Sequence, residues 1–210
     1  MKIGITTRLS ISDEGAPING VPTTYLNIIK EYAYPIIIDS TSNLDLYRNM
    51  LLNQLKEVDG IILPGGDKIS EVDLFIIEYC YINNIPLLGI CLGMQEISYY
   101  FDNKSITPIG NNSHFDMDKQ YLHEIQIVNN SYFQSLLKQD TISVNSRHKY
   151  HIFPNTHFTI QATCNDTIEA IKINNTYHMI GVQFHPEIMW NYDNNAKLLF
   201  EDFFNKIRAK

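Results

Sequence analysis

The segment PLLGICLGMQ (residues 86–95) has the pattern of a buried strand that runs through a tight turn into a helix. Cys91 falls on the turn, and Gly89 and Gly93 flank it two residues away on either side. Glycine is needed at these places because a Cβ would collide with the neighbouring strand or helix. Such a turn holds one side chain in a strained, exposed pose, and the helix that starts behind the thiol favours its thiolate form. The segment therefore predicts an activated cysteine nucleophile.

A second segment, GVQFHPE (residues 181–187), supplies the groups that such a nucleophile needs. It is an apolar strand that ends in His185, with Glu187 two residues further on. A nucleophile requires a base, and the base requires a group that orients it. Because a free cysteine often packs as a small hydrophobe, the prediction for Cys91 depends on this second segment. Cysteine, histidine and acid that lie far apart in sequence are typical of a set that meets only in the fold.

Together, the two segments resemble the motifs of the class I glutamine amidotransferase superfamily, in the same order. The resemblance implies a Cys-His-Glu triad, carried here by Cys91, His185 and Glu187. It also implies an α/β fold, a three-layer flavodoxin-like sandwich. Its central sheet is mostly parallel, with helices on both faces and a small antiparallel extension.

Alternating strand and helix patterns along the chain agree with this fold. Short, fully apolar runs suit strands of a parallel sheet that is buried on both faces, where ligands bind at the carboxyl ends of the strands. Residues 97–121 are polar and irregular and are expected to form loops beside the site. The expected strands are Lys2–Thr6, Pro35–Ile38, Gly60–Leu63, Leu87–Ile90, Leu122–Asn129, Thr141–Val144, Phe158–Cys164 and Ile168–Ile173, and the expected helices are Thr23–Glu31, Leu44–Lys56, Val72–Asn83 and Asn194–Arg208.

Composition sets the broad class. A chain of 210 residues, 44% hydrophobic and 19% charged, suits one globular domain over residues 1–210. The net charge of −7 disfavours nucleic-acid and anionic-membrane partners. The first apolar run is too short for a signal peptide and no segment approaches a membrane span, so a cytoplasmic location is expected. The chain leaves its oligomeric state open, a homodimer included.

No cofactor or metal is expected. The three cysteines form a sparse, odd set, which indicates neither a disulfide framework nor a zinc site. His114 and His123 have no partner at metal-ligand spacing, so they are expected to be solvated or locally hydrogen-bonded. His148 and His151 likewise lack a carboxylate or cysteine at ligand spacing.

The turn PGGD (residues 64–67) follows an apolar strand and allows backbone amides to point at one spot. By the resemblance, Gly66 and Leu92 supply the two oxyanion-hole amides, with Gly65 beside the substrate. The resemblance also places Gln95 against the glutamyl group and backbone groups of Asn145 and Ser146 at its α-amino and carboxylate ends.

Two further residues are weaker candidates for substrate contact. His148 lies near the Asn145 turn, but a hydrogen-bonded structural histidine is at least as well supported. Arg8 follows the first strand at the ligand-binding end, where it could pair with a carboxylate or phosphate on the leaving amine. A solvent-facing arginine on a loop over Leu9–Asn19 is the commoner situation for such a residue.

Four other segments resemble the γ-glutamyl hydrolase branch of the superfamily, the peptidase C26 group that includes γ-glutamyl-γ-aminobutyrate hydrolase. They are IGIT (3–6), VPTTYL (21–26), VNSRH (144–148) and IEAI (168–171). Two positions depart from that branch: Leu92 stands where arginine is usual, and Ser98 where asparagine is usual. Because of these two departures, the resemblance does not identify the amine that the substrate releases.

The expected function is a stand-alone hydrolase that cleaves a small γ-glutamyl metabolite through a cysteine thioester. It would release glutamate and an amine, which could be a small amine, an amino acid or a nucleotide-linked amidate. The alternative is a glutaminase subunit that delivers ammonia to a separate synthase. A second alternative is an inactive regulatory homologue, although a decayed enzyme has no physical reason to keep all three triad residues.

Overall fold

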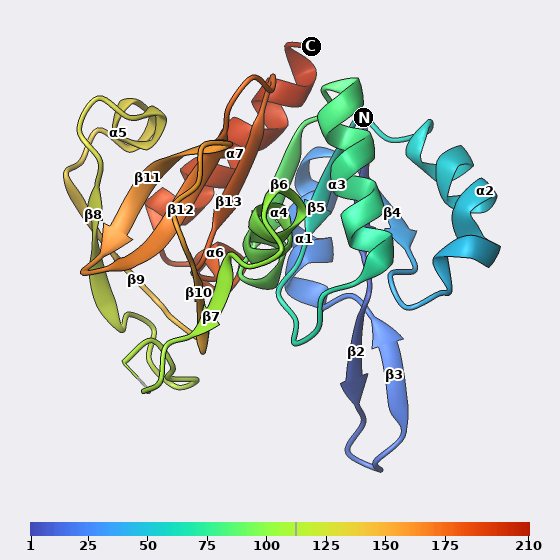
Figure 1. The fold of residues 1–210 in the computed structure, drawn as a ribbon, viewed down its shortest axis with the longest axis horizontal. Coiled ribbons are helices and arrows are strands. Elements are labelled where there is room, and N and C mark those ends of the chain that lie inside the picture. The colour runs from blue at the N-terminus through green and yellow to red at the C-terminus, as the bar shows by residue number, and fades with distance from the viewer. Residues whose placement is uncertain (112) are drawn as a thin grey trace.

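The structure is a computed structural model that describes residues 1–111 and 113–210. Its elements alternate between strand and helix in the first half of the chain and are mainly strands in the second half (Figure 1). In chain order they are β1 Lys2–Thr6, β2 Arg8–Ile11, β3 Pro17–Gly20, α1 Thr23–Tyr32, β4 Tyr34–Ile38, α2 Leu44–Leu55, β5 Gly60–Leu63, α3 Glu71–Asn83, β6 Leu87–Ile90, α4 Leu92–Phe101, β7 Ile106–Pro108, β8 His123–Ile127, α5 Tyr132–Leu137, β9 Thr141–Val144, β10 Tyr150–Ile152, β11 Phe158–Cys164, β12 Thr167–Ile173, β13 Met179–Val182, α6 Pro186–Met189 and α7 Asn194–Arg208.

Nine strands form one central sheet in the order β4-β1-β5-β6-β13-β12-β11-β8-β9. The first five strands of this order are parallel, and the remaining four join antiparallel. Strands β5, β6 and β13 are buried along their whole length, as continuous apolar runs require. The expected α/β sandwich is confirmed, and its antiparallel part is larger than the small extension that the sequence suggested.

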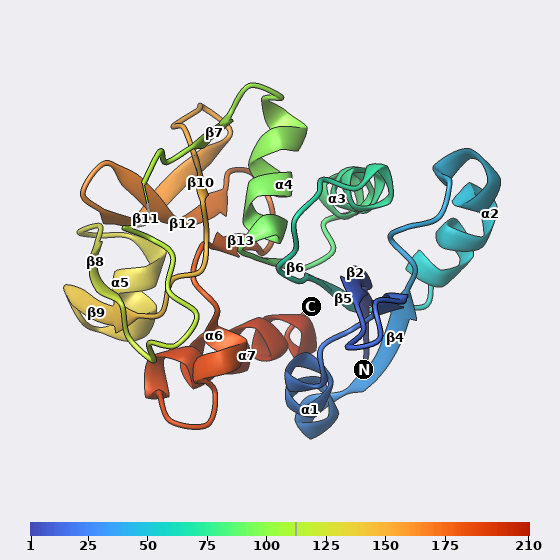
Figure 2. The same ribbon diagram turned by 90° about the horizontal axis from the view of Figure 1, so that it is seen from below.

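Helices cover both faces of the sheet, with α1 and α7 on one side and α2, α3 and α4 on the other (Figure 2). Each face has its own hydrophobic core. Ile28 of α1 and Phe203 of α7 belong to one core, whereas Ile76 of α3 and Met94 of α4 belong to the other. No helix among the described residues is both long and apolar enough to cross a membrane.

Several elements were not expected from the sequence. Strands β2 and β3 pair as an antiparallel hairpin that projects from the sheet, whereas a loop was predicted there (Figure 1). The side chains of Leu9 and Ile11 are 61% and 77% exposed, so the hairpin buries neither face and its sequence shows no inside-outside alternation. Helix α5 is short and begins at a Ser131 cap. In the stretch predicted as loops, α4 continues to Phe101 and β7 follows it, while residue 112 lies outside the described residues.

Close backbone contact fixes the turn between β6 and α4. A Cβ added at Gly93 would lie 2.3 Å from the Leu63 carbonyl oxygen, and one at Gly89 would lie 2.6 Å from the Gly93 backbone. Backbone atoms cannot move aside as a flexible side chain can. The two glycines are therefore required for α4 to pack directly on β5 and β6.

We expect Gly93→Ala to lower the free energy of unfolding by about 1–3 kcal/mol, the usual cost of overpacking a core. Gly20→Ala is the matched control, because its Cβ would approach no atom closer than 3.8 Å. Urea denaturation of the two variants measures the difference. Equal stability of Gly93→Ala and the parent protein would show that this backbone contact does not constrain the turn.

Candidate active site

Cys91 lies between β6 and α4 with backbone angles φ 52° and ψ −103°. A non-glycine residue in this region is strained and persists only where its surroundings hold it. Its N–H donates to the Val182 carbonyl at 2.8 Å, which ties the turn to strand β13. The thiol stands at the N-terminal end of α4, where exposed amides and the helix dipole favour negative charge.

His185 follows β13, the strand that pairs in parallel with β6, so the two residues lie at neighbouring carboxyl ends of the sheet. Its ring Nδ1 lies 2.7 Å from Glu187 Oε1, which orients the imidazole. Burial of the ring lowers its pKa. The charges of Glu187 and of the Cys91 thiolate, with hydrogen bonds to both side chains, outweigh this and raise the pKa of His185 to about 10.

Asn145 fixes the backbone of His185. Its side-chain amide donates to the His185 carbonyl at 2.9 Å, and its side-chain oxygen accepts from the His185 N–H at 2.8 Å. The sequence suggested backbone groups of Asn145 as substrate contacts and gave no sign of this side-chain role. The reciprocal pair holds the base in register with the nucleophile.

Gln183 and Gln95 link the nucleophile to the wall of the site. The amide nitrogen of Gln183 lies 3.6 Å from Cys91 Sγ, and its amide oxygen accepts from Gln95 at 3.2 Å. Gln95 also donates to the Tyr150 carbonyl at 3.3 Å. The sequence motif contains Gln183 but gives it no role, because an uncharged amide in an apolar strand carries no distinctive signal.

The glycine turn after β5 faces the catalytic pair. A Cβ at Gly65 would lie 2.7 Å from His185 Cε1 and 3.5 Å from the Cys91 Cβ, so only glycine leaves room for both. A Cβ at Gly66 would instead meet the Arg8 side chain and Leu92 Cδ2. Gly65 therefore borders the catalytic pair and Gly66 borders Arg8 and Leu92, and the assignment of the Gly66 and Leu92 amides to an oxyanion hole stays a prediction.

Tyr25 is a buried residue of the site that sequence reasoning missed. Its hydroxyl accepts from the Gly65 N–H at 3.4 Å. Burial, and next the charge of Glu187, raise the pKa of Tyr25 well above its usual value, so the hydroxyl keeps its proton. Its side chain therefore supports the glycine turn from α1.

Arg8 is not the solvent-facing arginine that is commoner at such a position, and its contact with substrate stays a prediction. Its guanidinium pairs with Asp73 at 2.5 Å and with Glu96 at 3.3 Å, and both carboxylates are fully buried. It also donates to the Pro64 carbonyl at 2.8 Å. Protein groups thus occupy its donors, and Arg8 braces the glycine turn. Burial is the main cause that raises the pKa of both acids, and the charge of Asp73 raises that of Glu96 further.

Ser146 and His148 are buried beside the site. The Ser146 hydroxyl donates to the His114 carbonyl at 2.6 Å, and its carbonyl accepts from the Asp116 N–H at 3.0 Å. His148 Nδ1 lies 2.9 Å from the Tyr150 carbonyl oxygen. His148 is therefore hydrogen-bonded in this structure, which agrees with a structural role, and its contact with substrate stays a prediction.

His114 was expected to be solvated or locally hydrogen-bonded, and the structure buries it. With His123 and His148 it surrounds the carboxylate of Glu169, a grouping that sequence spacing did not indicate because the four residues come from separate segments. Burial raises the pKa of Glu169, but the three imidazoles lower it by more, and the net result is well below the ordinary range. The buried carboxylate is therefore ionised.

A hollow of about 640 Å³ lies between the β2–β3 hairpin and the loops that follow β4 and β5. Its lining includes Arg8, Ser40 and Asp67, but not Cys91 or His185. It therefore adjoins the outer side of the glycine turn rather than the catalytic pair.

Comparisons with known proteins agree with this geometry. The family model for glutamine amidotransferase class-I matches residues 27–206. A CTP synthase from Microcystis aeruginosa is 31% identical over 183 residues, which cover 71% of this chain and 33% of that protein. The chain spans about a third of the length of the curated relatives it matches.

Two solved structures share the fold. A protein described as a GMP synthase subunit, from Thermoplasma acidophilum, has a TM-score of 0.73 at 18% identity, covering 100% of this chain and 94% of that one. The glutaminase domain of a Trypanosoma brucei CTPS, with bound acivicin, has a TM-score of 0.66 at 20% identity, covering 98% and 94%. At these identities the likeness establishes the fold alone.

We expect the His185 ring to titrate near pH 10 and to do so at lower pH in Cys91→Ala, because the thiolate is one of the charges that raise its pKa. The same raised pKa predicts that the catalytic rate falls at alkaline pH. His185 holds the proton for the leaving group at neutral pH and loses it as the pH rises through about 10. NMR titration of the imidazole in both proteins measures the pKa. An unchanged pKa in Cys91→Ala would refute the coupling.

We expect Arg8→Met to destabilise the protein by about 3–5 kcal/mol, because it leaves two buried carboxylates without their cation. Arg48→Met is the control of the same residue type. Arg48 is exposed and stacks over Phe75 at 4.8 Å, so its loss should cost about 1 kcal/mol or less. Urea unfolding of both variants provides the test, and equal losses would contradict the bracing role of Arg8.

Proposed function

The chain belongs to the class I glutamine amidotransferase family, and from this premise we propose that it hydrolyses the γ-amide of glutamine and supplies the ammonia to a synthase. The observation that carries the proposal is the set of Cys91, His185 and Glu187 at adjacent carboxyl ends of β6 and β13. Each member has its own support: the strained turn, the Asn145 clamp and the 2.7 Å imidazole–carboxylate contact.

In the first half of the reaction, the Cys91 thiolate attacks the γ-carbonyl carbon of glutamine. The carbonyl oxygen becomes an oxyanion, which the amides of Gly66 and Leu92 are proposed to bind. The imidazolium of His185 gives its proton to the departing nitrogen, and the C–N bond breaks. Ammonia leaves and a γ-glutamyl thioester remains on Cys91.

In the second half, His185 takes a proton from water as the water oxygen attacks the thioester. The C–S bond breaks, glutamate leaves, and the thiolate and imidazolium are restored. Glu187 keeps the ring oriented and compensates its positive charge in both halves. Because the pKa of His185 is raised to about 10, the imidazole carries the proton at neutral pH that the leaving nitrogen needs.

The glutamyl end of the substrate is proposed to lie against Gln95, Gly65 and the backbone of Asn145 and Ser146. Gln95 is held by Gln183, which also contacts Cys91 Sγ, so the group that would contact substrate is linked to the nucleophile. The Ser146 carbonyl and hydroxyl already have protein partners. Its amide is thus the group that we assign to substrate.

Delivery of ammonia to a synthase is favoured over a stand-alone role by the curated relatives, which are CTP synthases. The synthase could be another chain or another part of a longer protein. The hairpin β2–β3 projects from the same strand end as the glycine turn. The side chains of Leu9, Ile11 and Ile18 are exposed on it and offer an apolar contact surface to the synthase.

A stand-alone γ-glutamyl hydrolase is the second candidate. The segments that resemble that branch, residues 144–148 and 168–171, lie beside the catalytic pair: Asn145 clamps His185, and the Gln183 N–H donates to the Glu169 carbonyl at 2.8 Å. These contacts place two of the resembling segments at the site, and they fit a glutaminase equally well.

We expect the purified chain to release glutamate from glutamine, and Cys91→Ala to lose the activity by at least about 10³-fold, because no other group forms the thioester. Cys80→Ala is the matched control, since Cys80 is a buried cysteine of α3 outside the site. A coupled glutamate assay measures release from glutamine and from a panel of γ-glutamyl amides.

Release from glutamine that rises when a CTP synthase or GMP synthase partner domain is added would support ammonia delivery. Fast release from one other amide, with slow release from glutamine, would support the stand-alone hydrolase instead. Full activity of Cys91→Ala on any of these substrates would refute the nucleophile assignment and both candidate functions.

A further inference from the structure

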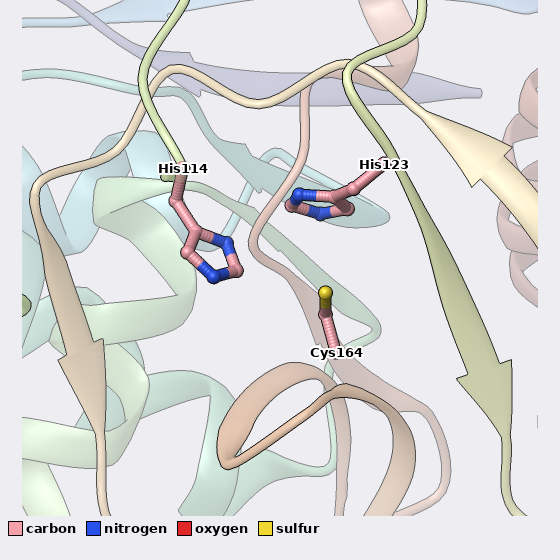
Figure 3. A group of neighbouring side chains, drawn as sticks. All are labelled: His114, His123 and Cys164. Carbon is pink, nitrogen blue, oxygen red and sulfur yellow. The ribbon is translucent and has the colours of Figure 1, made fainter. Parts of the chain in front are cut away.

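Four titratable side chains meet in the antiparallel half of the molecule, outside the catalytic set. His114 lies between β7 and β8, His123 begins β8, His148 lies between β9 and β10, and Glu169 lies on β12. Figure 3 shows His114 and His123 reaching in from separate segments, with the sulfur of Cys164 below them. His114, His148 and Glu169 are at most 5% exposed.

The three imidazoles converge on a single oxygen. Glu169 Oε1 lies 3.1 Å from His114 Nδ1, 3.3 Å from His123 Nε2 and 3.6 Å from His148 Nε2. One donor atom from each of His114, His148 and Glu169 lies within 4.8 Å of the other two. Ligands on a tetrahedral zinc ion at bond lengths of about 2.0–2.1 Å stand about 3.3–3.4 Å apart, so these contacts have the spacing of ligand edges.

The contacts around Glu169 do not have the geometry of good hydrogen bonds. Within the described residues, none of the three nitrogens makes a hydrogen bond of acceptable geometry, and neither do the two oxygens of Glu169. Five buried polar atoms without partners are costly, and such a group in a native structure calls for a specific explanation, such as an ion.

His148 gives the sharpest indication. Its Nδ1 lies 2.9 Å from the Tyr150 carbonyl oxygen, which can only accept, so Nδ1 carries the proton. In a neutral ring the lone pair is then on Nε2, and it faces the lone pairs of Glu169 Oε1 at 3.6 Å. Two acceptors repel unless a proton or a metal cation lies between them. A ring N–H bound to a backbone carbonyl is also the usual outer support of a metal-ligating histidine.

From this geometry we propose that the chain binds one divalent transition-metal ion, of the zinc class, through His114, His148 and Glu169, while His123 contacts the Glu169 carboxylate from beside the set. Imidazole and carboxylate donors together suit zinc better than calcium or magnesium, which prefer oxygen alone. Cys164 Sγ groups with His114 and His123 but not with Glu169, so it stays outside the set.

The ion would be structural, and its role does not depend on the proposed glutaminase activity. It would join the loop of His114 and the loop of His148 to strand β12. The second loop also carries Asn145, which clamps His185, and the Glu169 carbonyl accepts from the Gln183 N–H at 2.8 Å. The metal site would thus hold the Asn145 loop and β12 together behind the catalytic pair, without contacting the reacting atoms.

The test uses the full chain carrying Cys91→Ala, so that the catalytic thiolate cannot compete for metal. After removal of metals by a chelator, Zn²⁺ is titrated by calorimetry and the melting temperature is measured with and without the ion. We expect one ion per chain and a higher melting temperature with zinc, but not with Mg²⁺. Failure to bind one zinc ion would overturn the proposal without testing the triad.

Glu169→Gln and His114→Asn should each weaken zinc affinity by more than about 100-fold, since loss of even an outer-shell partner typically costs about 10–100-fold. His178→Asn is the matched control, a buried histidine 3.5 Å from Asp202 in another part of the fold, and it should keep full affinity. Affinity that is unchanged in the two ligand variants, or lost in His178→Asn, would overturn the assignment. Circular dichroism establishes that each variant is folded.

A second measurement keeps all the proposed ligands in place, so misfolding of a ligand variant cannot account for its result. Co²⁺ bound to the Cys91→Ala chain should give the visible spectrum of a four-coordinate nitrogen and oxygen site, without a thiolate charge-transfer band. Cys164→Ser should leave that spectrum unchanged. A thiolate band that disappears in Cys164→Ser would contradict the proposed ligand set, and absence of any cobalt spectrum would contradict the site itself.

Discussion

The structure depends on the turn at Cys91, where the backbone passes from β6 into α4 at a positive φ of 52°. At this turn α4 packs directly against β5 and β6. Such close packing is possible because Gly89 and Gly93 carry no Cβ. The N–H of Cys91 donates to Val182, which anchors the turn to the strand that leads to the base. One local backbone constraint therefore sets the position of the nucleophile, its helix terminus and its distance from His185.

Around this turn, the site is assembled from the ends of parallel strands and steadied from outside. Asn145 clamps the backbone of His185, Arg8 braces the glycine turn through Pro64, and Tyr25 contacts Gly65. The buried Arg8 pairs with Asp73 and Glu96 show how much polar structure supports the glycine turn. These groups do no chemistry themselves, yet they hold reacting groups within the small tolerances that catalysis needs.

The sequence was sufficient for the fold class, and it placed the triad residues at strand ends that the structure brings together, because two long motifs and continuous apolar runs carry that information. It was insufficient for Arg8 and for the histidines around Glu169. Their partners come from distant segments, and spacing along the chain says nothing about convergence across a sheet. The β2–β3 hairpin was missed because exposure on both faces removes the alternation that marks a strand. The contact of Gln183 with Cys91 was also missed, because an uncharged amide in an apolar segment does not indicate a functional role.

The central claim is that Cys91 forms a γ-glutamyl thioester. Intact-protein mass spectrometry of acid-quenched enzyme, mixed briefly with glutamine, tests it most directly. We expect a single glutamyl adduct that maps to the peptide containing Cys91 and decays as glutamate appears. An enzyme that hydrolyses glutamine while its adduct lies on Cys80 or Cys164, or that never carries a covalent adduct at any quench time, would contradict this claim.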